Sequence, residues 1–181
     1  IPEHCFYWVS MGIKARHGRE RTAVRTAILD AARELFTAEG YRNVSMRKIA
    51  ERIEYSPAAI YSYFDSKDEI FFALAEEGYL RLGDRVAAVL ARIDDPLEAL
   101  RRALLAFYRF GKENPEYFEL MFLDRSVPSL AQDIERFEFF QHVTARGEAA
   151  IRSLVERGVF RAGLDPAAAL HILWAALIGP A

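Results

Sequence analysis

The sequence has little cysteine and no long hydrophobic run. A single cysteine, Cys5, cannot form an internal disulfide and excludes a cysteine-based zinc cluster. No apolar run approaches the roughly 18 residues that a bilayer-spanning helix needs, so we expect no membrane segment. The 181 residues are 52% hydrophobic and 28% charged, which is enough for the core of one ordinary domain or of two small ones. We therefore expect a globular, cytoplasmic protein.

Signs of catalysis are also lacking. We find no nucleophile–base pair, no metal cluster and no glycine-rich phosphate loop. His142 follows Glu138 by four residues and His171 lies further on, but a metal site would need more ligands in a closed geometry. We expect a protein that is not an enzyme and that holds no metal or cofactor.

A net excess of positive charge is missing too, because the formal charge is −2. That value argues against a generic basic nucleic-acid binder, yet it hides an asymmetry. Residues 11–67 hold eleven Lys and Arg against seven Asp and Glu, a balance of +4, whereas residues 68–181 have a balance of −5. A basic segment at the front of a folded unit is typical of phosphate binding, although a solvated tail has the same composition.

Helical patterns run through the whole chain, and no stretch alternates long enough to predict a sheet. The spacing predicts helices over 22–39, 46–53 and 57–64, and a long helix from the Ser66 capping box to about Arg92. Prolines at 96, 115, 128 and 166 stand where further helices begin. We interpret residues 1–10 as added leader sequence and expect the leader and basic arm, 1–20, to be disordered.

The two short helices, 46–53 and 57–64, match a helix-turn-helix with its turn at Glu54–Tyr55. The second helix of that motif lies in the major groove and presents its first residues to the bases. Small side chains there allow the helix to approach the base edges closely. Hydroxyl groups can donate hydrogen bonds to phosphate oxygens, and a cation at the start of a helix favours binding of an anion such as phosphate. The residues so placed are Pro57, Ala58 and Ala59 for the bases, and Tyr61, Ser62, Tyr63 and Lys67 for the backbone. The tyrosines could instead pack on neighbouring helices, and the alanines could simply favour helix.

A family resemblance rests on these residues. The run RKIAERIEYSPAAIYSYFDSKDEI, from Arg47 to Ile70, resembles the signature of the TetR/AcrR family of bacterial transcriptional regulators, and ILDAARELF at 28–36 resembles that family's first helix. The resemblance implies an all-α fold with a three-helix DNA-binding domain, 21–66, and a helical effector-binding and dimerisation domain, 67–181. It also implies DNA contacts for Ser45 and Arg47 beside those named above.

One residue departs from the family pattern. Members usually have glycine in the turn, and here the residue is Glu54. If Glu54 adopts a left-handed conformation, its side chain costs roughly 1 kcal/mol.

Aromatic residues gather in the second half of the chain, where residues 107–140 hold nine of the 21 Phe and Tyr. A helical core of this kind can be filled, or it can enclose an apolar ligand. The resemblance favours a pocket for an apolar, aromatic or acyl effector. The residues expected to line it are Phe107, Phe110, Tyr117, Phe118, Met121, Phe122, Phe137, Phe140 and Trp174. Arg109 or Arg125 could pair with a ligand carboxylate, although arginines are more often surface charges.

The segment 166–178 is apolar on most of its circumference, so it must be buried in a core or an interface. Family members dimerise through their last two helices, and we expect Leu170, Leu173 and Leu177 to face a partner. From the resemblance we expect one more helix after Ala181, and that last helix is missing from the sequence. The function it implies is that of a homodimeric repressor, bound to a palindromic DNA operator and released by a small ligand. The alternative is an interaction module, or a DNA-binding protein without ligand control, on the same fold.

Overall fold

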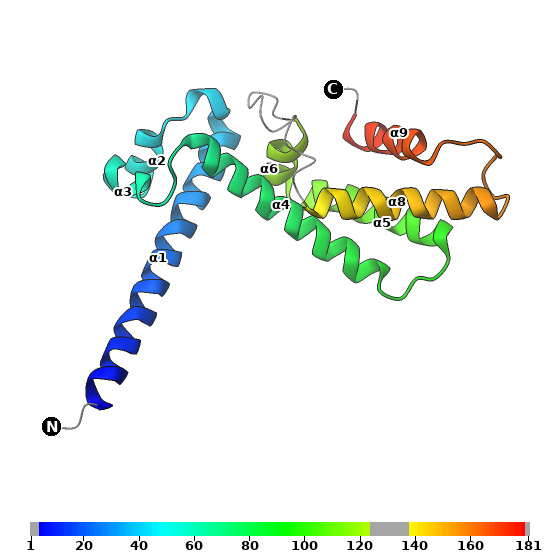
Figure 1. Ribbon diagram of the computed structural model, residues 1–181. Helices are drawn as coiled ribbons and strands as arrows, with labels where there is room; N and C mark the ends of the chain where they lie inside the picture. The colour runs from blue at the N-terminus through cyan, green and yellow to red at the C-terminus, as the bar shows by residue number, and fades with distance from the viewer. Residues whose placement is uncertain (1–3, 124–137, 180–181) are drawn as a thin grey trace. The chain divides into compact units, whose positions relative to one another are not determined.

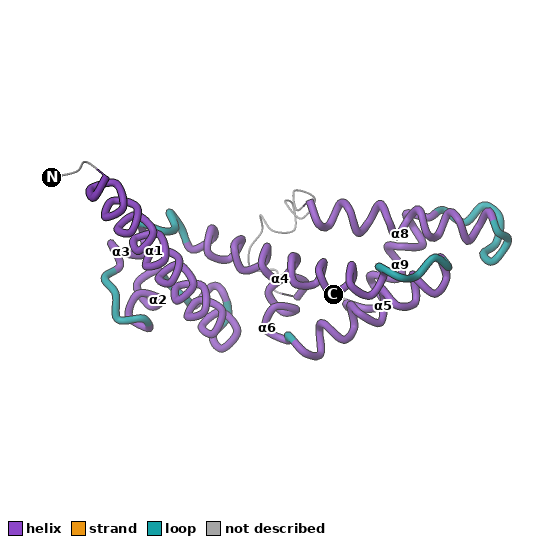
Figure 2. Tube along the Cα trace, turned by 90° about the horizontal axis from the view of Figure 1, so that it is seen from below, coloured by secondary structure: helices purple, strands orange, loops and turns teal. Residues whose placement is uncertain are grey.

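The computed structural model describes residues 4–123 and 138–179, with the backbone alone for 4–17 and 138–140. Every regular element in those ranges is a helix (Figure 2), which confirms the all-α fold class. The chain divides into two compact units, Ile1–Ile70 and Phe71–Ala181. The sequence-based boundary, between residues 66 and 67, lies four residues before this division. No helix in the described part combines the length and hydrophobicity that crossing a membrane requires.

The first unit is built on helix α1, His4–Glu39, followed by the short η1, Tyr41–Asn43, by α2, Met46–Arg52, and by α3, Pro57–Tyr61. Helix α1 is much longer than the 22–39 that we predicted, and its first half extends past α2 and α3 (Figure 1). Residues 4–20, for which we expected disorder, belong to this helix. No proline interrupts the chain between His4 and Gly40, whose φ of 78° ends the helix.

The core of the first unit joins α1 to both short helices. Ile28 and Ala32 on α1 are fully buried, as are Ile49 on α2 and Ile60 on α3. Phe64, just after α3, is also buried. Burying an aliphatic or aromatic side chain of this size stabilises a fold by about 1.5–3 kcal/mol. This packing sets the positions of α2 and α3 on α1.

The second unit contains most of α4, Lys67–Leu90, then α5, Pro96–Glu113, α6, Pro115–Phe118, and a π-helical turn, η2, Glu119–Leu123. Helices α8, Glu138–Glu156, and α9, Pro166–Ile178, complete it. Asp95 and Asp165 cap α5 and α9, and each side chain accepts a backbone N–H of the first turn, as the Asp-Pro pairs predict. Helix α8 lies beside both α5 and α9 (Figure 1). The start that we predicted at Pro128 lies outside the described residues.

Helix α9 turns the leucines expected at a partner surface toward its own unit. Leu170 is only 5% exposed and packs with Leu100, Ile151 and Leu154, while Leu173 lies against the same cluster. Leu177 lines the cavity described below. Within the unit these leucines therefore face inward, and their assignment to a dimer interface stays a prediction. A helix that is apolar all round has no pattern to show which face is inside. The large apolar side chain that α9 does expose is Ile172, at 67%.

Candidate functional site

Two capped helix starts define the helix-turn-helix. The Ser45 hydroxyl accepts the Lys48 N–H at 3.2 Å at the start of α2, and the Ser56 hydroxyl accepts the Ala59 N–H at 3.2 Å at the start of α3. Pro57 occupies the first position of α3, where no backbone donor is needed. These local bonds fix where each helix begins, as the sequence predicts.

The turn between the helices is closed by the backbone of α2. Tyr55 N–H bonds Ala50 O at 2.9 Å and Glu54 N–H bonds Glu51 O at 3.3 Å, which together form a Schellman motif. Glu54 has a φ of 60°, so the left-handed conformation considered from the sequence is present. Helix α3 ends at Tyr61 rather than Phe64, because the Ser62 hydroxyl donates to Ala59 O at 2.6 Å and draws the chain into a turn.

The first turn of α3 presents small side chains to solvent. Pro57 and Ala58 are exposed and Ala59 is half-buried, while the Tyr61 ring is 51% exposed. On α2, Arg47 has 80% of its side chain exposed and pairs with its own helix neighbour Glu51, at 2.8 Å. The hydrogen bond and charge of Glu51 raise the pKa of the Arg47 guanidinium. Each of these residues is accessible to solvent, which the predicted contacts require.

Basic residues of α1 lie against the end of the α3 segment. The Arg21 guanidinium lies 5.5 Å from the centre of the Tyr63 ring and donates to Ser62 O at 3.4 Å. The Arg25 guanidinium lies 5.0 Å from the centre of the Phe64 ring. Both arginines belong to the basic front of the chain, and no individual role was predicted for either of them. Their spacing of four residues on one helix face is the signal that could have shown this contact.

Lys67 holds the first turn of α4 to the η1 segment. Its Nζ donates to Tyr41 O at 2.8 Å and to Val44 O at 2.9 Å, and it lies 4.0 Å from the centre of the Tyr41 ring. The Tyr41 hydroxyl also donates to the Asp68 carboxylate. Burial lowers the pKa of Lys67, although Asp68 opposes that shift. Two of the three ammonium N–H groups are thus engaged within the unit, and the phosphate contact expected of Lys67 stays a prediction.

The predicted capping box opens α4 in a modified form. Ser66 Oγ accepts the Glu69 N–H at 3.2 Å, as predicted. The Glu69 carboxylate accepts the N–H of Asp65 at 2.8 Å, one residue before the usual partner.

In the second unit, most of the aromatic residues expected around a ligand form a filled core instead. Phe110, Tyr117 and Met121 are 2%, 1% and 3% exposed and line no described cavity. Phe118 and Phe122 stack at a centroid distance of 5.0 Å, and both contact Phe107. These five side chains fill core space and do not line the cavity described below, so their assignment to a ligand pocket stays a prediction. Phe137 and the side chain of Phe140 lie outside the described residues.

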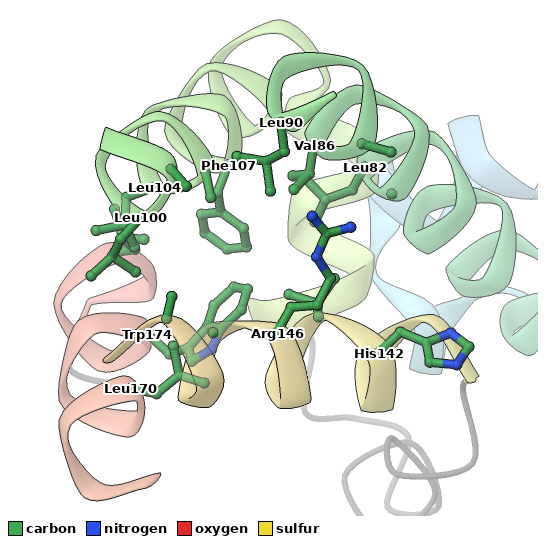
Figure 3. Close-up of a pocket in the computed structure, with 18 of the residues that line it drawn as sticks. Leu82, Val86, Leu90, Leu100, Leu104, Phe107, His142, Arg146, Leu170 and Trp174 are labelled. Carbon is green, nitrogen blue, oxygen red and sulfur yellow. The ribbon is translucent and has the colours of Figure 1, made fainter. Parts of the chain in front are cut away.

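A cavity of about 410 Å³ does exist, and α4, α5, α8 and α9 form its walls (Figure 3). Phe107 and Trp174 line it as expected, and their rings meet edge to face at 4.7 Å. The remaining wall is mostly aliphatic, and sequence reasoning missed it because leucine and valine are the ordinary core residues of helices. It includes Leu82, Val86, Leu90, Leu100, Leu104 and Leu170. Its size is in the range of small-molecule sites.

Three side chains bring charge or a titratable ring to this cavity, and none of them was predicted as a site residue. Arg146 and His142 come from α8, one turn apart, and Asp84 comes from α4. Figure 3 shows the Arg146 guanidinium extending between α8 and α4, whereas the His142 ring points away from the centre. The cavity is therefore apolar with a charged edge.

Comparison with known proteins agrees with this arrangement. A family model described as "Bacterial regulatory proteins, tetR family" matches residues 28–74. PfmR of Thermus thermophilus, a TetR family transcriptional regulator of known structure, is 31% identical, with 83% of this chain and 81% of PfmR covered and a TM-score of 0.68. The chain belongs to the TetR family. The family members found are regulators rather than enzymes, as the lack of a catalytic constellation led us to expect.

Two further relatives extend the comparison. The nucleoid occlusion factor SlmA of Vibrio vulnificus is 29% identical over 164 residues, which cover 90% of this chain and 82% of SlmA. AibR in complex with isovaleryl coenzyme A and operator DNA is 20% identical and shares the fold, with a TM-score of 0.72 over 85% of this chain and 83% of AibR. The chain spans only 35% to 44% of the length of three HTH-type transcriptional regulators of Bacillus subtilis and Mycobacterium tuberculosis that it also matches.

Proposed function

We propose that this TetR-family protein is a DNA-binding transcriptional regulator that acts in the cytoplasm as a homodimeric repressor. A small, mostly apolar ligand in the cavity of the second unit releases it from a palindromic operator. The observation that carries the proposal is the capped helix-turn-helix, whose α3 begins with the exposed, small Pro57 and Ala58.

The DNA-binding surface has separate groups for bases and backbone. Ala58 and Ala59 are small enough for close approach to base edges, and their methyl groups suit thymine methyls. Arg47, Ser45 and Tyr61 are exposed and supply a cation and hydroxyls for phosphate oxygens. Arg21 and Arg25 support this surface from α1 by contacting Tyr63 and Phe64.

Two copies are needed to bind a palindrome. A dimer places its recognition helices in successive major grooves, roughly 34–36 Å apart. A ligand shifts that spacing only to the extent that it prefers one state of the protein over the other. Helix α4 is suited to carry the shift, because this one helix bears Lys67 near its start and the cavity residues Leu82, Val86 and Leu90 further on. AibR, whose complex holds both a coenzyme A ester and operator DNA, supports ligand control in this fold.

The test is binding of the full chain to DNA from upstream of its own gene, measured by fluorescence anisotropy at several salt concentrations. Each phosphate contact adds about −0.9 to the slope of log K against log salt, so a regulator should bind one sequence selectively with a steep slope. An Arg47→Ala and Ala58→Glu double variant should lose this binding and keep its helical content. Selective binding that is absent, or that does not depend on salt, would rule the proposal out.

A second function is favoured by one observation. SlmA covers nearly the whole chain and bears the name of a nucleoid occlusion factor rather than of a transcriptional regulator. A DNA-binding protein without ligand control would occupy many dispersed chromosomal sites. Mapping occupied sites in cells distinguishes the two functions, since the repressor should concentrate at one or a few promoters.

A further inference from the structure

The charged edge of the cavity restricts the charge of the ligand that fits it, whereas the apolar wall alone does not. Arg146 is exposed, yet its guanidinium extends over the same space that Leu82 and Val86 border (Figure 3). At the other side of that space, Phe107 and Trp174 meet edge to face. The cavity thus has an aromatic, apolar end and a cationic end.

The Arg146 guanidinium is available for a ligand. No carboxylate among the described residues lies within 4 Å of it, although several other arginines of this unit have such a partner. Arg85, for example, binds both oxygens of Glu113, at 2.6 and 2.9 Å. Arg146 therefore presents its N–H groups with no described acidic neighbour to occupy them.

We propose that the cavity binds an amphipathic carboxylate, with the carboxylate on Arg146 and the apolar part between Phe107 and Trp174. This inference rests on the proposed function in so far as the cavity is taken to be the effector site. A guanidinium binds a carboxylate through two parallel N–H···O bonds, which fixes direction as well as charge. Because Arg146 is exposed, the carboxylate keeps part of its hydration, and the desolvation cost of a buried ion pair is reduced.

Asp84 is the group that opposes this polarity. It lines the cavity from α4, and its negative charge would favour a cationic ligand instead. His142, the other titratable group on the wall, points away from the centre (Figure 3). The choice between an anion and a cation therefore depends on Arg146 and Asp84, and each can be changed separately.

The preferred charge of the ligand is tested by comparing the affinities of three probes of equal chain length: anionic decanoate, neutral decanol and cationic decylamine. Binding to the full chain is measured by isothermal titration calorimetry without DNA, below the concentrations at which the probes form micelles. We expect decanoate to bind about tenfold more tightly than decanol, the factor that one charge-assisted bond of about 1.4 kcal/mol gives. Decylamine should bind more weakly than either.

Variants test the role of each charge. Arg146→Met should remove the preference for decanoate and leave decanol binding unchanged, and Arg146→Lys should keep part of the preference. Asp84→Asn should strengthen decanoate binding severalfold. The control is Arg152→Met, because Arg152 is an exposed arginine on the same helix that does not line the cavity.

Several results would overturn the inference: equal binding of decanoate and decanol, tightest binding of decylamine, no change with Arg146→Met in a folded protein, or no binding of any probe. The proposed function fails separately. If decanol releases the operator as well as decanoate does, the regulator stands and the inference is wrong. If no operator is bound but decanoate binding depends on Arg146, the inference stands and the regulator is wrong.

Discussion

The left-handed Glu54 in the helix-turn-helix turn predicts that Glu54→Gly stabilises the protein. Its φ of 60° places an ordinary side chain where glycine is favoured, and the exposed Glu54 side chain has no described hydrogen bond or ion pair that would offset the strain. The strain costs about 1–2 kcal/mol. Glycine removes this strain, but the greater conformational freedom of glycine in the unfolded chain lowers the free energy of unfolding by about 0.4–1 kcal/mol. The net gain should be about 0.5–1 kcal/mol.

The same chain contains a matched reference for this turn. Helix α8 ends in an equivalent Schellman motif, in which Val159 N–H bonds Leu154 O at 2.9 Å and Gly158 N–H bonds Val155 O at 3.0 Å. There the left-handed residue is Gly158, with a φ of 70°. A Cβ at Gly158 would meet no atom within 4 Å, so Gly158→Ala tests backbone strain without a steric clash. It should destabilise the protein by about 1 kcal/mol.

The assay is urea unfolding followed by helical circular dichroism, with thermal unfolding as a second measure. For a chain of this length, 1 kcal/mol corresponds to a change of about 2–4 °C in Tm. Glu54→Ala is the control, because it removes the carboxylate and keeps the strained Cβ. If Glu54→Ala stabilises as much as Glu54→Gly, charge rather than backbone is responsible and the reasoning is refuted. A loss of stability in Glu54→Gly would refute it as well.

The remaining predictions concern other contacts of the two units. Lys67→Met should lower the free energy of unfolding measured in urea by about 2 kcal/mol, because two hydrogen bonds from a charged group disappear. Arg47→Ala should leave this free energy nearly unchanged and should reduce the salt slope of DNA binding by about 0.9. Gly78→Ala should cost about 1–3 kcal/mol in the same assay, because its Cβ would clash with Met121 Sδ in the filled core. In the double variant with Met121→Ala, the two costs should not add in full. Hydrogen bonds from two arginines on α5 hold the pKa of Glu98 at about 2. Because this folded-state pKa lies below the unfolded value of about 4.3, the stability from Glu98 is present above pH 4.3 and is lost as the pH falls toward 2. Acid unfolding of Glu98→Gln should show less pH dependence in that window.

Local chemistry is what the sequence predicts best in this protein. The starts of α2 and α3 depend on Ser45 and Ser56, whose hydroxyls need only a backbone N–H a few residues away. The cost of Glu54 could be anticipated for the same reason, since a Schellman motif involves six consecutive residues. Local reasoning is less exact at helix ends, since α3 ends at Tyr61 and not at the predicted Phe64.

The cavity could not be predicted in that way, because a hollow is a property of four packed helices and not of any one residue. Tyr117 and Phe118 are as aromatic as Phe107, yet their rings pack together in the core while Phe107 borders open space. Leu170 belongs to the core cluster of its own unit. The sequence does not show this, because α9 is apolar on all sides and its pattern does not indicate which face is buried. From the sequence Arg146 is one more surface arginine, and only its place on the cavity wall across from α4 makes it a candidate for ligand binding. Charge near an apolar hollow is therefore the most informative feature that the structure adds, because it restricts the chemistry of the occupant where the apolar wall restricts only its size.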